Sequence, residues 1–435
     1  MSVKRAYLLV LVVWIHLGDF AAAWVYQGGA LPEVGWARVV RDMTVILAAC
    51  LCLATVRIAR SLLLPFLIYG LLIFLSLATS AKSGVPIGVL VGSFGTLLIP
   101  MLFFLVGYYC VRDPADIQAL VACLVIIACL SAIFGAWDIH HTEFWTQTIQ
   151  FPAYMADVKG MVYGAEPETG LPYNFFIDLD QTRRAAGLLA APLAQGMVLA
   201  VAGVLVVAAG PARLTASRVL IFLLILLGLC AGVWMSGTRG AMLAGTIALT
   251  GYLLTSRASR RHPLARLIAA AAVVLVIGLA TRDVVDATIN QTDGSSPGHW
   301  AAFQRNIDGL FQIPALGYGI GRQGPVAAQA AITNVGGGEG AVFSVAYQSG
   351  VLAALALLIF YAVCLRRLWR ADREHQAHLA LAVFWLMIGF ATTLVTSDHM
   401  LSVSGSASLW LLTGGAMRLL SRAQERPDAA AEAAA

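Results

Sequence analysis

Apolar runs of about twenty residues alternate with short polar segments along almost the whole chain. A helix of about that length crosses a hydrocarbon core of roughly 30 Å. The pattern therefore predicts an all-α polytopic membrane protein with about twelve transmembrane helices. We place these helices at residues 6–26, 39–58, 62–81, 86–110, 116–138, 186–209, 218–237, 240–256, 264–281, 342–364, 378–397 and 400–420.

Two long polar loops, at residues 140–184 and 283–341, interrupt the apolar pattern. Loops of this length usually carry function or are disordered. They divide the chain into six consecutive parts. These are an N-terminal five-helix part at 1–139, the first loop at 140–184, helices six to nine at 185–282, the second loop at 283–341, helices ten to twelve at 342–420, and an alanine-rich charged tail at 421–435 for which the composition predicts disorder.

Basic residues in the short loops predict how the chain is inserted in the membrane. Those of the two termini and of the even-numbered loops all fall on one side of the bilayer, which the positive-inside rule assigns to the cytoplasm. They are Lys4, Arg5, Arg57, Arg60, Arg112, Arg213, Arg218, Arg257, Arg260, Arg261, Arg366, Arg367, Arg370, Arg373, Arg418, Arg422 and Arg426. We therefore expect both termini in the cytoplasm and both long loops on the outer side.

The composition agrees with a membrane protein and excludes other classes. The chain has 60% hydrophobic and 12% charged residues and a mean hydropathy of +0.81, outside the range of soluble domains. The net charge of +5 comes from the short basic loops, so we expect no nucleic-acid partner. The seven cysteines lie in or beside apolar segments, which indicates neither a disulfide framework nor a thiolate metal site. No Walker A, Gly-x-Ser-x-Gly or His-Glu-x-x-His motif occurs, so ATP hydrolysis, serine esterase chemistry and zinc proteolysis have no support.

Three arginines outside the positive-inside set are of particular interest. Arg184 and Arg305 belong to the two long loops, and Arg239 belongs to an outer turn between two predicted helices. An arginine at the edge of the membrane is costly unless it has an anionic partner, so each is a functional candidate. Guanidinium groups match phosphate oxygens, and lipid phosphates or diphosphates are the anions of the outer leaflet. The alternative is that each arginine reaches lipid headgroups or pairs with a nearby acid.

Glycines follow the two loop arginines at the same spacing, Gly196 twelve residues after Arg184 and Gly317 twelve residues after Arg305. Glycine makes up 41 of the 435 residues, so this spacing is weak support for a paired site by itself.

The long loops hold further candidate residues. The first loop interleaves aromatic and acidic side chains, which suits stacking on sugars and hydrogen bonding to them. They are Trp137, His140, His141, Phe144, Trp145, Tyr154, Tyr163, Glu166, Glu168, Tyr173, Asp178 and Asp180. Asp178 and Asp180 have the Asp-x-Asp spacing that can place a divalent cation on a diphosphate. That motif is short and common, so a metal there is the alternative, and we expect neither a metal nor another cofactor.

The second loop and the last outer turn add polar and apolar pieces. The apolar residues Leu310, Phe311 and Ile313 predict a short helix on the membrane surface. Asp398 and His399 occupy a turn too tight to hold a substrate alone, and we expect them to line the site or to cap the final helix.

Four segments resemble the bacterial O-antigen ligase and polymerase family over roughly residues 180–420. They are the run from Arg184 to Pro192, the hairpin Ser236-Gly-Thr-Arg-Gly240, the stretch Ile313-Pro-Ala-Leu-Gly-Tyr-Gly319, and Glu339 to Gly350. The resemblance implies a GT-C-type glycosyltransferase of the bacterial inner membrane that works on the periplasmic side on glycans carried by undecaprenyl diphosphate. In this family two loop arginines hold the diphosphate, and Arg184 and Arg305 match them.

One position departs from the family pattern. Ligases of the family begin the helix after the second loop with a His-Asn pair eleven residues before a glycine. Counting back from Gly350 gives Glu339 and then Gly340, so a glutamate replaces the histidine. A glutamate can act as a general base, so we assign proton removal to Glu339, with His299 as the alternative base. A cap for the following helix is the structural alternative for Glu339.

The predicted reaction joins undecaprenyl-diphosphate-linked repeat units with inversion and without a metal. The diphosphate leaves as an anion, so Arg184 and Arg305 are expected to stabilise it. Arg239, Arg183, His299 and Arg322 are further candidates for binding the substrate and its diphosphate. The missing histidine favours a polymerase over a ligase.

A transporter is the main alternative from another class, although no convincing internal repeat is present. A role as a scaffold for an export complex is a third and weaker alternative. Besides the lipid-linked glycan and membrane lipids, export and chain-length components are candidate partners.

Overall fold

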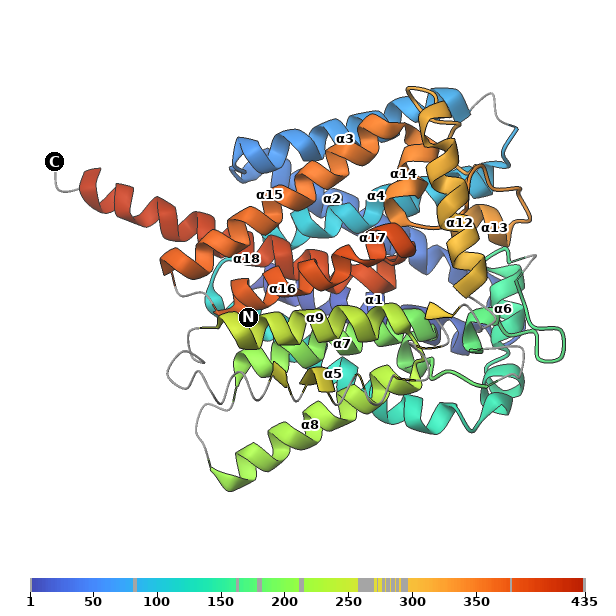
Figure 1. Ribbon diagram of the computed structural model, residues 1–435, viewed down its shortest axis with the longest axis horizontal. Coiled ribbons are helices and arrows are strands. Elements are labelled where there is room, and N and C mark those ends of the chain that lie inside the picture. Colours follow the sequence, from blue (N-terminus) through green and yellow to red (C-terminus); the bar gives the residue numbers. More distant parts are fainter. Residues whose placement is uncertain are drawn as a thin grey trace.

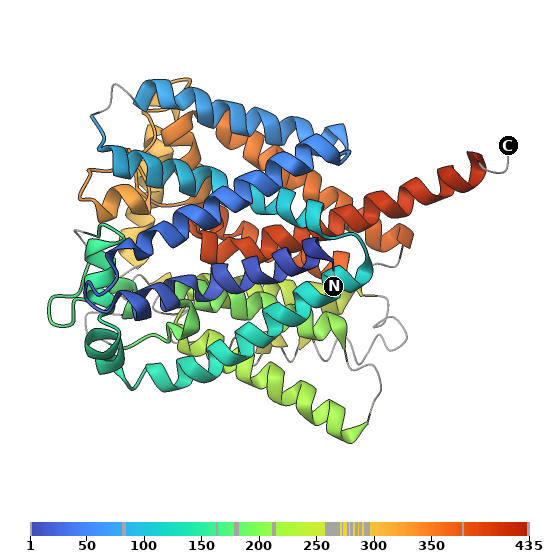
Figure 2. The same cartoon turned by 180° about the vertical axis from the view of Figure 1, so that it is seen from behind.

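The computed structural model is a bundle of long helices that run side by side (Figure 1). Loop segments with the short helices α6, α12 and α13 gather at one end of the bundle, here called the loop end (Figures 1 and 2). The start of α1 and the end of α18 lie at the opposite end. The structure describes residues 2–80, 84–161, 164–177, 182–210, 215–256, 296–375 and 378–432, together with isolated residues between 270 and 290.

The regular elements of the described residues are all helical, apart from two isolated bridges between Ala165 and Pro172 and between Phe176 and Arg183. The long helices are α1 (Val3–Tyr26), α2 (Trp36–Thr55), α3 (Arg60–Ser80), α4 (Ile87–Cys110), α5 (Pro114–Asp138), α7 (Pro192–Ala209), α8 (Ala216–Met235), α9 (Arg239–Thr255), α15 (Val351–His375), α16 (His378–Ala391) and α18 (Val403–Glu432). The short ones are η1 (Pro32–Gly35), η2 (Phe144–Thr148), α6 (Phe151–Asp157), η3 (Tyr173–Phe175), η4 (Gly187–Leu189), α12 (Ser296–Gly309), η6 (Leu310–Gln312), α13 (Pro325–Gln329), α14 (Ala341–Ser349), α17 (Thr393–Thr396) and η7 (His399–Leu401).

Eight helices of the described residues are long and apolar enough to cross a membrane, which agrees with a multi-pass membrane protein. They match eight of the predicted spans. Helices α2, α9 and α18 occupy three more, but α2 has Arg38, Arg41 and Asp42 in its first turns, and α9 has only 17 residues. The predicted span at 264–281 lies mostly outside the described residues. The count of about twelve therefore stays a prediction.

Close backbone contact holds the interior of the bundle together. Helices α4 and α18 approach so closely at Gly107 and Gly414 that a Cβ at either glycine would collide with a carbonyl oxygen of the other helix. Small residues allow this packing where lipid gives no hydrophobic drive for helices to associate. On the outside, α8 exposes Leu220, Leu223 and Leu227, which a hydrocarbon solvent would cover.

The predicted helix at 342–364 is broken into α14 and α15 at Gly350, a break that the apolar pattern does not reveal. Gly350 has φ +92°, and a Cβ there would collide with the carbonyl oxygen of Ala315. The Tyr318 amide also donates to the carbonyl oxygen of Tyr347 at 2.8 Å. The stretch from Ile313 to Gly319 therefore packs against the break, which gives that sequence motif a structural role.

The first loop forms a small aromatic core against the end of α1. Trp145, Phe151, Tyr154 and Phe175 are buried there together with Tyr26 of α1. Their burial leaves them little surface for stacking on a sugar. Among the aromatic residues predicted to face a glycan, Trp137 and Tyr173 are exposed, whereas Tyr163 lies outside the described residues.

Candidate active site

Arg184 is held by the turn that joins α8 to α9. Its Nε donates to the carbonyl oxygen of Ser236 at 2.8 Å, and Nη2 donates to the carbonyl oxygen of Gly237 at 2.9 Å and to the hydroxyl of Thr238 at 3.2 Å. Its backbone amide donates to the carbonyl oxygen of Phe175 at 2.9 Å. These acceptors hold the guanidinium in one orientation at the turn between α8 and α9.

Gly237 makes this arrangement possible, because it has φ +59° and a Cβ there would lie 3.1 Å from Nε of Arg184. Replacing Gly237 with alanine should lower the free energy of unfolding by about 1–2 kcal/mol, since an L side chain is strained in the left-handed region. Gly240→Ala is the matched control, because Gly240 is helical and its Cβ would meet Thr393 at an ordinary 3.6 Å. Thermal unfolding in detergent measures both variants, and an equal loss in the two would contradict the strain argument.

Arg239 joins the second loop to the same turn. It is the first residue of α9, and its Nη1 donates to the hydroxyl of Ser296 at 3.2 Å. Ser296 begins α12, which carries His299 one turn further along. The hairpin that holds Arg184 therefore also holds the start of α12.

Asn306 fixes the segment that leads to Glu339. This side chain is 1% exposed, its Nδ2 donates to the carbonyl oxygen of Glu339 at 2.7 Å, and its Oδ1 accepts from the amide of Gly337 at 2.8 Å. Gly337 lies so close to α12 that a Cβ there would collide with the carbonyl oxygen of Ala302. The glycine-rich run thus serves close packing against α12, which sets the position of Glu339.

His299 and Glu339 form a pair on the surface of the loop end, through Nδ1 of the imidazole and Oε2 of the carboxylate. The two side chains are 57% and 40% exposed, so both are accessible. Gly340 is the N-cap of α14, and no side chain makes a cap hydrogen bond there. The Glu339 carboxylate is therefore directed to His299 instead of capping the helix. Glu339 therefore has a histidine next to it, but this histidine comes from 40 residues earlier in the chain and not from the start of α14.

Asp398 and His399 complete this cluster from the turn between α17 and η7. The Ser344 hydroxyl of α14 donates to Oδ1 of Asp398 at 2.6 Å. Burial raises the pKa of Asp398 to about 7, the Ser344 hydrogen bond opposes this, and the negative charge of Glu339 adds to it. Burial lowers the pKa of His399 to about 4, and the charges of Arg184 and His299 act in the same direction. His399 is therefore neutral at pH 7. It lies close enough to Arg184 of the first loop and His299 of the second loop for their charges to act on it.

Two other predicted binding arginines of the second loop are placed differently. Arg305 is on the exposed side of α12, and no hydrogen bond or ion pair to its guanidinium occurs among the described residues. Arg322 is half-buried next to Gly321, and its carbonyl oxygen accepts from the Val335 amide at 2.9 Å. No contact in the described part of the chain joins Arg305 to Arg184.

Arg183 points away from Arg184. The chain is extended there, so neighbouring side chains face opposite sides. Arg183 is 10% exposed, lies 3.9 Å from Oδ1 of Asp138, and stacks over the rings of Phe175 and Phe176 at 5.1 and 5.5 Å. These contacts give Arg183 a structural environment inside the first loop.

The two arginine-to-glycine spacings reflect separate packing contacts. A Cβ at Gly196 would lie 2.6 Å from the Ser236 hydroxyl, so α7 packs directly on the turn that holds Arg184. Gly317 has φ +71° and packs on the backbone of Gln348 in α14. The shared spacing of twelve residues therefore corresponds to two different packing contacts.

The two aspartates proposed for a metal, Asp178 and Asp180, lie outside the described residues. Among the residues that are described, no three His, Cys, Asp or Glu side chains are grouped to hold a metal ion.

Sequence reasoning missed the part played by Asn306 and gave Asp398 and His399 only a lining or capping role. In the sequence these residues are recognisable only as polar side chains next to an apolar or a glycine-rich run. Such a signal does not tell which distant residue will be the partner.

The fold is that of a multi-pass α-helical membrane protein. Its candidate site lies at the loop end and combines arginines with acidic and histidine side chains. The family model for WcaD colanic acid polymerase matches residues 23–413, nearly the whole chain. The chain therefore belongs to the WcaD colanic acid polymerase family, which confirms the resemblance to polysaccharide polymerases. A comparison with curated proteins gives no match.

Proposed function

We propose that this protein is a glycosyltransferase that joins undecaprenyl-diphosphate-linked oligosaccharide units into a surface polysaccharide on the periplasmic side of the bacterial inner membrane. The observation that supports this most is that the charges of Arg184 and His299 both act on His399, while the charge of Glu339, the partner of His299, acts on the adjacent Asp398. The family is one of polysaccharide polymerases, so the chemistry of a lipid-linked donor fits the cluster.

The reaction breaks the bond between the anomeric carbon of the donor sugar and its diphosphate oxygen. A hydroxyl oxygen of the acceptor glycan bonds to the same carbon from the opposite face, which inverts its configuration. The electron pair of the broken bond leaves with the diphosphate, and Arg184 stabilises this charge, with Arg239 and Arg305 in support. In this mechanism the positive charge of the arginines stabilises the leaving diphosphate, so no metal ion is required.

Glu339 accepts the proton of the attacking hydroxyl. His299 orients the carboxylate through their contact, the arrangement of a base and its orienting partner. Asp398 holds the N-terminal turn of α14 through Ser344 and places a second carboxyl group close to Glu339. Neutral His399 contributes polarity to the site without adding positive charge.

The charge pattern supports a periplasmic position of the candidate site. The basic short loops favour a cytoplasmic position for both termini, and α1 begins and α18 ends at the bundle end opposite the cluster. An outer position of the loop end suits a glycan that is assembled outside the cell.

Transfer to a lipid A-core acceptor by a ligase is the second candidate function. The glutamate at position 339, where ligases have a histidine, and the match to a polymerase family both favour polymerisation. Membership of that family also argues against a transporter.

The lipid profile of a deletion strain tests the proposed function. Loss of a polymerase should leave single repeat units on the lipid carrier or on the final acceptor, because export and attachment still proceed. Loss of a ligase would instead leave long chains on the carrier. Chromatography of extracted lipid-linked glycans separates the two, and a normal chain-length distribution in the deletion strain would contradict both.

A further inference from the structure

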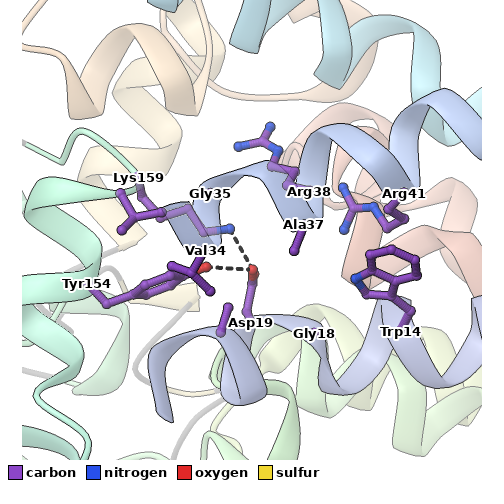
Figure 3. A pocket seen from close by; sticks show the side chains of 12 residues that line it. Trp14, Gly18, Asp19, Val34, Gly35, Ala37, Arg38, Arg41, Tyr154 and Lys159 are labelled. Carbon is purple, nitrogen blue, oxygen red and sulfur yellow. Dashed lines mark hydrogen bonds and ion pairs between the residues drawn. The ribbon is translucent and has the colours of Figure 1, made fainter. Parts of the chain in front are cut away.

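A small polar cavity of about 40 Å³ lies between α1, α2 and α6, away from the cluster (Figure 3). Asp19 of α1 is at its base, where it accepts from Nζ of Lys159 at 2.6 Å and from the Tyr154 hydroxyl at 3.2 Å. Arg38 and Arg41 of α2 flank the other side. All of these residues come from the half of the bundle at the loop end.

The lining of this cavity carries more positive than negative charge. Arg41 pairs with Asp42 at 2.8 Å, and Arg38 lies 4.0 Å from the same carboxylate, so one acid serves two arginines. The Arg38 side chain is 44% exposed. The backbone of Gly35, just before α2, also lines the cavity and places the positive end of a 20-residue helix there. An anion at the mouth would meet a guanidinium and a helix N-terminus together.

An apolar groove of about 430 Å³ continues from this cavity along the outside of α1 and α2. The two spaces share the lining residues Trp14, Gly18, Ala22, Val34 and Ala37. Beyond these, the groove is lined by small and aliphatic side chains, including Val13 and Ala21, which are exposed on the surface of α1. The two spaces thus lie side by side along α1, one bordered by charged side chains and the other by apolar ones.

The first loop connects this surface to the candidate active site. Tyr154 contacts Asp19 and also belongs to the aromatic core that contains Phe175. The carbonyl oxygen of Phe175 in turn accepts from the amide of Arg184. A single folded loop therefore borders both the polar cavity and the arginine of the site.

We propose that the α1–α2 groove binds the carrier lipid of the second substrate, a polyprenyl diphosphate that bears the acceptor glycan. This inference rests on the proposed function, because joining two lipid-linked units requires two carriers at the same membrane face. A diphosphate is too large for the 40 Å³ cavity, so it sits at the mouth against Arg38 while the polyprenyl chain fills the groove. Arg184 holds the diphosphate of the donor.

Native mass spectrometry of the detergent-purified full chain with undecaprenyl diphosphate tests this assignment. We expect two molecules bound to the wild type. Arg38→Glu and Ala21→Trp should each leave one, with at least about tenfold weaker binding of the second. Leu223→Trp, a lipid-facing change on α8, is the matched control and should bind two. Arg38 and Ala21 are both exposed, so neither substitution disturbs the core. Size-exclusion elution checks that each variant is folded.

Phosphatidylglycerol and undecaprenol serve as competing probes. We expect neither to displace the second undecaprenyl diphosphate at equal concentration. Displacement by phosphatidylglycerol would identify an ordinary phospholipid site and overturn the proposal, as would a wild type that binds only one carrier or an Arg38→Glu variant that still binds two. Arg184→Ala separates the two proposals. If it still binds two carriers, the donor assignment of Arg184 fails while the groove stands.

Discussion

Replacing Arg184 with alanine should reduce chain elongation by about 100- to 1,000-fold, the loss expected when a main donor to a developing oxyanion is removed. The guanidinium is fixed by carbonyl oxygens of Ser236 and Gly237, so it is positioned before the substrate arrives. Because the guanidinium is already in place, no free energy is spent on reorganising it when the diphosphate leaves. The measurement is incorporation of labelled lipid-linked repeat units into polymer by purified protein in liposomes.

Arg218→Ala is the matched control for Arg184→Ala, because Arg218 is exposed at the start of α8, in a predicted cytoplasmic loop. It should elongate chains at the wild-type rate. Arg184→Lys should recover only part of the loss, since an ammonium group cannot make the same forked contacts. A wild-type chain-length distribution from correctly inserted Arg184→Ala protein would remove Arg184 from the mechanism.

Replacing Glu339 with glutamine should lower the elongation rate by about 100- to 10,000-fold, the contribution typical of a positioned general base. The substitution keeps the size of the side chain but removes its negative charge, and with it its capacity to accept a proton at neutral pH. Binding of the lipid-linked donor should change little, because the arginines that hold the diphosphate are untouched. Single-turnover rates together with donor affinity separate these two effects.

Asp398→Asn provides the comparison for Glu339→Gln. An asparagine oxygen can still accept from the Ser344 hydroxyl, so this variant should retain a rate within about tenfold of the wild type. Because burial raises the pKa of Asp398 to about 7, this carboxyl is ionised mainly above pH 7. If Asp398 were the base, the wild-type rate would fall about tenfold per pH unit below pH 7. That profile, together with an active Glu339→Gln variant, would transfer the role of base to Asp398.

Much of the candidate site was accessible from local sequence. Arg184 and the Ser236–Gly240 hairpin were singled out because an arginine outside the positive-inside pattern needs an explanation, and the structure places them in direct contact. The contacts of Glu339 were not accessible in the same way. Its neighbours His299 and Asp398 lie far away in the chain, and only the packing of α12 and α14 with the last outer turn brings them close.

The alternation of apolar and polar segments by itself determined that this is an all-helical membrane protein, and where most of its helices lie. Hydropathy and the distribution of basic residues are local properties that the bilayer selects directly. Only the tertiary structure decided that Arg183 lies against Asp138 and the rings of the first loop while its neighbour Arg184 is directed to the hairpin. It also decided that Asn306 fixes Glu339, and that α1 and α2 leave a groove with a cationic mouth. These features depend on which distant backbones meet, and no local pattern encodes that.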